Sequence, residues 1–132
     1  GVVLAGQSAG MICWFRWGHS DSLSYYKPED WEYIRVRGMG LVDAIGCPHF
    51  NSQTAGVPRA DSFKRMVTKH SELGIAVDNH CAVEFTDGAF RIHSSRSGVG
   101  AYQLYKRRDT LCIEPLEQVN GLRPIATLFD GC

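Results

Sequence analysis

The sequence predicts an α/β fold in which a mostly parallel sheet is flanked by helices and followed by an antiparallel hairpin region. Residues 2–5 and 74–77 are short runs without a polar side chain, which is typical of strands buried on both faces of a parallel sheet. Between them, apolar residues at helical spacing predict a helix over residues 59–72. Residues 82–92 alternate around an Asp-Gly dipeptide, which is typical of a tight hairpin turn.

Length and composition favour a single domain without a charged partner. The chain has 132 residues, 44% of them hydrophobic, so one core is expected over residues 1–132. Its 14 basic and 14 acidic residues cancel and form no block of like charge, so we expect neither nucleic acid nor a membrane surface as partner. No apolar run approaches the roughly 18 to 20 residues of a membrane span.

Cysteine spacing favours reduced thiols in the cytoplasm. The cysteines are odd in number, widely spaced and without a C-x-x-C pair, so neither a disulfide framework nor a metal site is expected. They are Cys13, Cys47, Cys81, Cys112 and Cys132.

The predicted strand at residues 2–5 leads into Gly-Gln-Ser-Ala-Gly, residues 6–10. This G-x-S-x-G pattern is typical of a nucleophile elbow, where small neighbours let the backbone turn sharply. Ser8 would then stand clear of the sheet at the positive end of a helix, and the N–H of Ala9 would point to where an oxyanion forms. The alternative is a tight turn whose serine only caps the helix.

The first strand also raises a question of completeness. A buried parallel strand needs neighbouring strands and crossover helices, and the residues that follow supply too few of them. We therefore expect an N-terminal half that has been cut away, is encoded separately, or lies outside this chain.

After this turn, residues 9–17 are almost wholly apolar and predict a short helix beneath the sheet. A polar loop is expected at residues 19–22, and short strands are expected at residues 34–36 and 41–45. The second of these strands leads into Cys-Pro-His-Phe, residues 47–50.

The second half of the chain contains clearer boundaries. Pro58 and Asp61 mark the start of the helix over residues 59–72. The strand at residues 74–77 ends at a group of polar residues, 78–80. Beyond the hairpin, further strands are expected at residues 101–105 and 111–113.

A serine nucleophile needs a base, and five histidines compete for that role. His49 is the best candidate, because it follows a predicted strand at the sheet edge where the elbow also emerges. His70 is expected to be structural and His93 to be solvated. His19 and His80 remain open.

The third catalytic group cannot be chosen from spacing alone. Asp78 and Asn79 follow a strand and lie nearest the inferred site, while Asp21 lies in the loop after the elbow helix. Glu84 is a further candidate, and each of these residues could instead be an ordinary cap or turn residue. Arg59 could bind a substrate carboxylate at a helix start, or be a solvated arginine.

Taken together, several segments resemble, in order, the dipeptidase E group of serine peptidases, the family that also contains cyanophycinase. The segments are Gly-Gln-Ser-Ala-Gly-Met, Ser20-Asp21-Ser22, Cys-Pro-His-Phe, Arg59 and Gly-Ile-Ala-Val-Asp-Asn. The resemblance implies an α/β sandwich akin to class I glutamine amidotransferases and a cytoplasmic peptidase acting on short peptides with N-terminal aspartate. It also implies Ser8 as nucleophile, His49 as base and Arg59 as a contact for acidic substrate.

The chain departs from the family pattern in two places. Several members carry a glutamate as third residue where this chain offers Asp78 and Asn79, and others use the aspartate that matches Asp21. Members also have an N-terminal half whose glycine-rich turn donates a second oxyanion N–H. The resemblance therefore implies that this chain needs that half for activity.

The residues are also compatible with two rival functions. One rival is an esterase of the α/β-hydrolase type, in which a late histidine, His93, is the base. The other is a non-catalytic fragment or relative. The expected partners are a short peptide substrate, a separate N-terminal polypeptide and a second copy of the chain, and no cofactor is expected.

Overall fold

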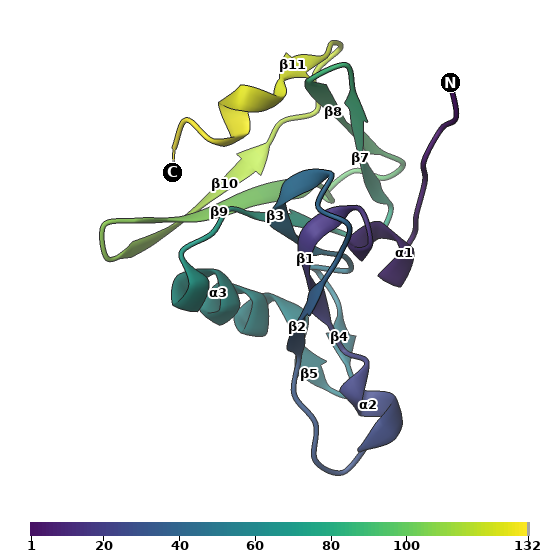
Figure 1. Cartoon of the computed structure of the whole chain (residues 1–132), viewed down its shortest axis with the longest axis vertical. Helices are drawn as coiled ribbons and strands as arrows, with labels where there is room; N and C mark the ends of the chain where they lie inside the picture. The colour runs from purple at the N-terminus through teal and green to yellow at the C-terminus, as the bar shows by residue number, and fades with distance from the viewer. Residues whose placement is uncertain (132) are drawn as a thin grey trace.

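The computed structural model of the protein describes residues 1–131, which form two main sheets and one helix of about three turns (Figure 1). A six-stranded sheet lies in the middle. The helix covers one of its faces and a three-stranded sheet packs against the other. The fold is therefore α/β, as the sequence predicts.

The large sheet is mixed, with the strand order β10-β9-β6-β3-β1-β2. Only β1–β3 and β3–β6 pair in parallel, whereas β2, β9 and β10 run antiparallel to their neighbours. The prediction of a mostly parallel sheet is therefore wrong for this chain. Short connections such as the one between β9 and β10 force antiparallel pairing, because parallel neighbours need a long crossover. The strands are β1 (Phe15–Ser20), β2 (Ile34–Arg37), β3 (Val42–Cys47), β6 (Gly74–Val77), β9 (Ala101–Arg107) and β10 (Thr110–Leu116).

The crossover between β3 and β6 is α3 (Arg59–His70), the helix that the sequence predicts. Pro58 precedes it with φ −60°, Asp61 lies in its first turn, and Ser71 ends it in the left-handed region with φ 53°. Phe63, Val67 and neighbouring side chains pack on the central strands through a cluster of buried residues. Its members are Ile45, Cys47, Phe63, Met66, Val67, Ala76 and Leu104.

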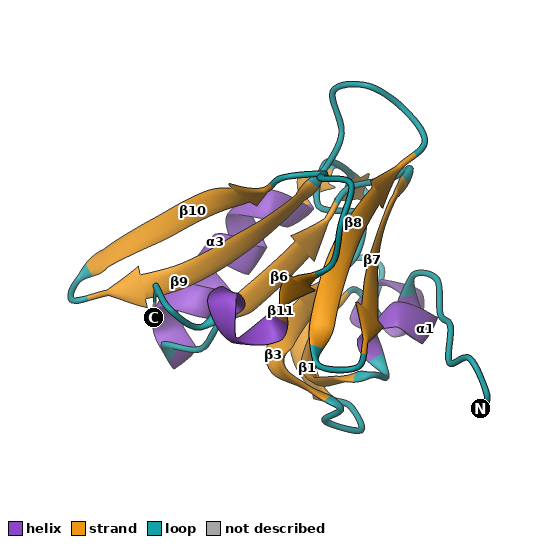
Figure 2. Cartoon of the chain, turned by 90° about the horizontal axis from the view of Figure 1, so that it is seen from above, coloured by secondary structure: helices purple, strands orange, loops and turns teal. Residues whose placement is uncertain are grey.

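On the opposite face lies the small antiparallel sheet, with the order β11-β8-β7 (Figure 2). The hairpin of β7 (Cys81–Thr86) and β8 (Ala89–Ser94) confirms the Asp-Gly prediction. Asp87 and Gly88 both have positive φ, 48° and 74°, as a type I′ turn requires. Beyond them, β11 (Arg123–Pro124) leads into a 3₁₀ turn, η1 (Ile125–Leu128). Phe90, Ile92 and Leu128 bring this layer into the second buried cluster.

The first residues differ from the sequence prediction. Residues 2–5 form no strand, and the side chains of Val2 and Val3 are each 89% exposed. Figures 1 and 2 show this segment running away from both sheets. A strand exists only where a neighbour accepts and donates its backbone hydrogen bonds, and within residues 1–131 no strand pairs with this segment.

The predicted helix over residues 9–17 is also wrong in extent. Only α1 (Ala9–Ile12) is helical, and β1 begins at Phe15. Pairing decides the difference, because β1 lies between β2 and β3 and bonds to both. His19, expected in a loop, therefore lies in β1 and is fully buried.

Small elements border the large sheet where β1 and β3 end. They are α2 (Leu23–Tyr26) and the hairpin of β4 (Gln53–Thr54) and β5 (Val57–Pro58). Within residues 1–131, none of the helices is both long and apolar enough to cross a membrane.

Candidate active site

The turn at Ser8 has the backbone conformation of an elbow. Ser8 has φ 56° and ψ −121°, a region that non-glycine residues rarely adopt and that costs on the order of 1 to 3 kcal/mol. The turn is so tight that a Cβ added to Gly6 would lie 2.0 Å from the carbonyl oxygen of Gly10. Gly6 is therefore required for close backbone approach, whereas a Cβ at Gly10 would meet nothing within 4 Å.

The hydroxyl of Ser8 does not cap the helix α1. Ser8 is exposed and its side chain makes no capping hydrogen bond to α1, so the alternative of a simple cap is wrong. Its carbonyl oxygen accepts from Met11 N at 3.0 Å, which closes the turn. The helix has only four residues, so its dipole is weaker than a longer helix would provide.

His49 is held at the carboxyl end of β3 by a second unusual turn. It follows buried Pro48 and has φ 56°. Its Nδ1 hydrogen-bonds to Oδ1 of Asn79, the residue that follows Asp78 after β6. With Nδ1 acting as donor there, Nε2 is left as the acceptor that a general base requires.

Backbone contacts support this pair of residues. Asn79 N donates to Oδ1 of Asn51 at 2.9 Å, and Phe50 N donates to the carbonyl oxygen of Val77 at 3.0 Å. The segments after β3 and β6 are thus tied together at adjacent strand ends, which is the placement that parallel pairing of β3 and β6 produces.

Asp78 points to a different partner. Its Oδ2 accepts from Gly100 N at 3.1 Å and lies 3.5 Å from the hydroxyl of Tyr102, so this carboxylate braces the start of β9. Its side chain is buried, and Oδ1 has no hydrogen-bond partner within residues 1–131.

One open cavity of about 1390 Å³ connects Ser8 and His49. Ser8, His49, Asp78 and Asn79 all line it. In the described part of the chain no hydrogen bond joins Ser8 to His49, a looseness that is common before a substrate binds. The cavity continues along β7 and the N-terminal segment.

Asp21 and Arg59 form an ion pair with each other. Arg59 Nη2 donates to Oδ2 of Asp21 at 2.7 Å, and Thr54 Oγ1 donates to the same oxygen at 2.8 Å. The side chain of Arg59 is 4% exposed, and neither residue lines the cavity of Ser8. The guanidinium thus already has a carboxylate partner within the chain.

Sequence reasoning missed the polar cluster that surrounds this ion pair. His19 stacks on the ring of Tyr33 at 4.4 Å between centroids, and its Nε2 lies 3.0 Å from Ser62 Oγ. Burial and the neighbouring Arg59 lower the pKa of His19 to about 3, so its ring is neutral near neutral pH. This cluster could have been predicted only by placing residues 15–20 in a strand, which buries His19.

The loop after His49 is anchored to this cluster. Tyr33 donates its hydroxyl to the carbonyl oxygen of Val57 at 2.7 Å and accepts from Thr54 N at 3.1 Å. Ser52 N donates to the carbonyl oxygen of His49 at 2.9 Å, and Arg59 N donates to that of Ser52 at 3.1 Å. The cluster therefore positions His49 indirectly, through its loop.

The remaining histidines occupy varied positions. His93 is exposed, as expected, and its Nε2 lies 2.7 Å from Oε2 of Glu84 on the neighbouring strand. Hydrogen bonds from Arg91 and His93 lower the pKa of Glu84 to about 2. Both His93 and Glu84 line the large cavity. His80 is exposed, and His70 is half-buried at the end of α3.

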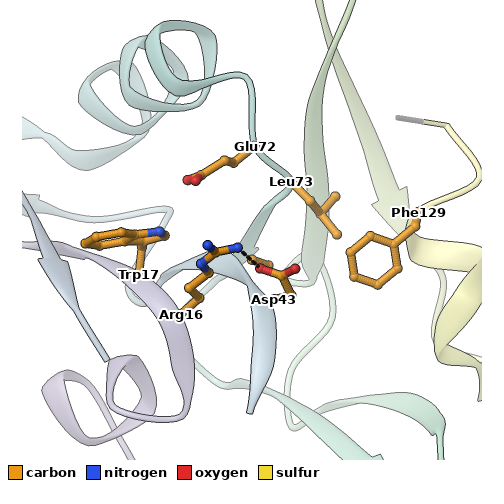
Figure 3. Close-up of a pocket in the computed structure, with 7 residues that line it drawn as sticks. Arg16, Trp17, Asp43, Glu72, Leu73 and Phe129 are labelled. Carbon is orange, nitrogen blue, oxygen red and sulfur yellow. Dashed lines mark hydrogen bonds and ion pairs between the residues drawn. The ribbon is translucent and has the colours of Figure 1, made fainter. Parts of the chain in front are cut away.

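A smaller hollow of about 190 Å³ lies elsewhere, near the amino ends of β1 and β3 (Figure 3). Arg16 and Asp43 form an exposed ion pair at 2.9 Å there. None of the candidate catalytic residues lines it.

The metal-ligating side chains of the described residues are scattered. No cluster of metal-ligating side chains is found within residues 1–131. The four cysteines in this range, Cys13, Cys47, Cys81 and Cys112, are free, and burial raises the pKa of the Cys47 thiol.

Comparison with known proteins places this chain in a family. The model of Peptidase family S51 matches residues 1–93, which include Ser8, His49 and Asn79. An uncharacterized peptidase of Bacillus subtilis (strain 168), YgaJ, is 31% identical over 118 residues, which cover 88% of this chain and 47% of that protein.

A second relative is the G2/mitotic-specific cyclin-1 of Trypanosoma brucei brucei. It is 34% identical over 103 residues, which cover 59% of this chain and 30% of that protein. The chain thus spans about half the length of the Bacillus peptidase and under a third of the cyclin. On the family match and the likeness to the peptidase, the chain belongs to Peptidase family S51.

Proposed function

We propose that the protein is a serine peptidase that hydrolyses short peptides through an acyl-enzyme on Ser8. The observation that carries the proposal is the elbow: Ser8 is held at φ 56° and ψ −121°, its side chain makes no capping hydrogen bond, and it lines the same cavity as His49. Strain of this kind is retained where it serves function.

In the proposed reaction, Ser8 Oγ attacks the carbonyl carbon of the scissile peptide bond while His49 Nε2 takes the hydroxyl proton. His49 then returns that proton to the departing amine. Water next attacks the acyl-enzyme, and His49 takes a proton from the water and gives it back to Ser8 Oγ as the acid is released. Asn79 holds the imidazole through Nδ1, so we propose this neutral amide as the third member. The N–H of Ala9, free of any hydrogen bond within residues 1–131, would bind the oxyanion.

The finer substrate preference is also a proposal. We propose N-terminal aspartate in the substrate, as the resemblance to dipeptidase E implies. Arg59 as its direct contact stays a prediction, and its ion pair with Asp21 would have to open or be shared for it to bind a substrate carboxylate. Comparing kcat/KM for Asp-Leu and Asn-Leu tests the preference, since only the first carries the side-chain charge.

The partners are proposed on the same basis. We propose that activity needs further polypeptide that supplies a second oxyanion donor and a neighbour for residues 2–5, whose apolar side chains are exposed in this chain. The free thiols support the cytoplasm as the place of action. Intact mass of the protein isolated from its natural source would identify such a companion.

A fluorophosphonate probe tests the nucleophile directly, because it labels activated serines and leaves ordinary ones unmodified. We expect one adduct, located on Ser8 by peptide mapping, and none in Ser8→Ala. Ser20→Ala, a serine outside the cavity, is the matched control and should label normally. An unlabelled native mass for the folded protein, isolated with any companion polypeptide, would instead support a non-catalytic relative.

One observation favours a second candidate function. His93 also lines the cavity and is paired with the carboxylate of Glu84, an arrangement that a base and its orienting acid would have. An esterase that uses this pair is therefore the alternative. The two mechanisms differ in which histidine is essential.

A further inference from the structure

The outer strand of the small sheet, β7, has an edge without a partner. It is last in the order β11-β8-β7 and pairs only with β8 in the described part of the chain. In a two-residue hairpin, the residues next to the turn, Thr86 and Ala89, exchange both backbone hydrogen bonds, and every second pair does the same. The N–H and C=O groups of Val83 and Phe85 therefore point outward.

The pairing of β8 with β11 confirms which backbone groups point outward. Phe90 lies opposite Phe85 and directs its backbone groups away from β7, where Arg123 of β11 pairs with it. Phe85 and Val83 have no corresponding neighbour, and no hydrogen bond to their backbone groups is present within residues 1–131.

This open edge borders the cavity that holds the nucleophile. Cys81 through Thr86 all line it together with Ser8 and His49, and β7 begins two residues after Asn79. Figures 1 and 2 both show the N-terminal segment on the open side of β7. Six strand residues extend about 20 Å from the catalytic end.

Resting on the proposed function, we infer that β7 is a binding edge for the peptide substrate, which adds to it as an extended strand and thereby presents its scissile bond to Ser8. A peptide main chain carries N–H and C=O groups at the same two-residue repeat as the open edge. Val83 and Phe85, two of the outward residues, can form up to four hydrogen bonds with it, independent of the peptide's side chains.

The occupant is a peptide because the edge is continuous with the site that would cleave one. Neutral backbone groups at the edge recognise an extended main chain rather than a charged headgroup or a nucleotide. The edge therefore selects for length and extended shape, while the catalytic end selects for the terminal residue.

The experiment measures kcat/KM for the active protein, isolated with any companion polypeptide, on peptides of two to six residues that share one N-terminal pair. We expect kcat/KM to rise with length by about 25-fold if two hydrogen bonds form and by up to about 600-fold if four form, since each contributes about 5-fold, and then to level off. N-methylation of hexapeptide nitrogens should lower kcat/KM about 5-fold or more at every second position and little between. No dependence on length, or equal effects at all nitrogens, would overturn the inference.

A protein variant tests the same edge from the other side. Val83→Pro removes one outward N–H without removing a hairpin hydrogen bond, so the ratio of hexapeptide to dipeptide kcat/KM should fall about 5-fold. Val83→Thr keeps that N–H and should retain the ratio. If Val83→Pro fails to fold by circular dichroism, the N-methyl series decides alone.

These readings separate the two proposals. Dipeptide hydrolysis and Ser8 labelling without length dependence would leave the peptidase function standing and refute the edge. If nothing is cleaved, the peptidase function fails, and fluorescence anisotropy of a labelled hexapeptide with its N-methyl isomers tests binding alone. A change in oligomeric mass in Val83→Pro without a kinetic change would assign the edge to a second copy and refute the inference.

Discussion

The two turns that would carry the catalytic groups are built differently. His49 follows a strand that is buried on both faces, and four backbone or side-chain hydrogen bonds around Asn51, Ser52 and Asn79 hold its loop. Ser8 follows an exposed segment, and the backbone hydrogen bonds that close its turn join residues 7–12, which are near neighbours along the chain. Both residues nevertheless have a positive φ of 56°.

The difference teaches where the strain at each turn is supported. At His49, contacts with the surrounding core hold the strained turn in place. Moving this turn would break contacts with β6 and with the loop to α3. At Ser8 the close approach of Gly6 and Gly10 does this locally. This side of the site should therefore depend more on local sequence, and the other side on the buried cluster behind it.

The largest expected effect distinguishes the base. His49→Ala should lower kcat by about 10² to 10⁴, because the proton of Ser8 then has no positioned acceptor. His93→Ala should lower kcat far less. Both are measured at saturating peptide, with Ser8→Ala as the inactive reference. The reverse order would assign catalysis to the His93 and Glu84 pair.

The next effect tests the local support of Ser8. Gly6→Ala should lower kcat about 100-fold, since its Cβ would lie 2.0 Å from the Gly10 carbonyl and move the hydroxyl. Gly10→Ala meets open space and should leave kcat within a few fold while raising the free energy of unfolding by up to about 1 kcal/mol. Equal losses of kcat in both variants would show that the close approach of Gly6 to the Gly10 carbonyl is not what positions Ser8.

A smaller effect concerns the orientation of His49. Asn79→Leu should lower kcat about 10-fold through loss of one hydrogen bond to Nδ1. Asn79→Asp should shift the acid limb of the kcat/KM profile upward by about one pH unit, because a negative charge favours the imidazolium. An unchanged acid limb would remove Asn79 from the site.

The last effect is on stability rather than on catalysis, and it concerns the His49 side. The pKa of His19 is lowered from its ordinary 6.5 to about 3. Between these two pH values the imidazole is protonated in the unfolded chain and neutral in the folded chain. The free energy of unfolding should therefore fall as pH drops from 6.5 toward 3, with a slope from this group of up to about 1.4 kcal/mol per pH unit. Urea denaturation at pH 6.5, 5.5 and 4.5 measures it, and His19→Gln should flatten the slope. Parallel slopes would refute the assignment.

Local chemistry accounts for the predictions that the structure confirms. The Asp-Gly hairpin, the start of α3 at Pro58 and the strand at residues 74–77 depend on φ preferences and short-range pattern. The sharp turn at Ser8 does so as well, because Gly6 is needed for it whatever packs around it.

Tertiary pairing accounts for the predictions that failed. Residues 15–20 are apolar enough for helix or strand, and β2 and β3 decided for a strand. Residues 2–5 have strand-forming side chains but no neighbour within residues 1–131. The ion pair of Arg59 with Asp21 joins residues 38 positions apart, a contact that no spacing rule predicts.

The sequence by itself determined the G-x-S-x-G corner, the histidine at a strand end and the family resemblance, because each depends on residues adjacent along the chain. Only the tertiary structure decided that Asn79 rather than Asp78 or Asp21 contacts His49 and that His19 is buried. It also decided that β7, which within residues 1–131 pairs only with β8, lines the same cavity as Ser8. These facts depend on which strands become neighbours, and that choice is made by burial of the whole chain rather than by any one segment.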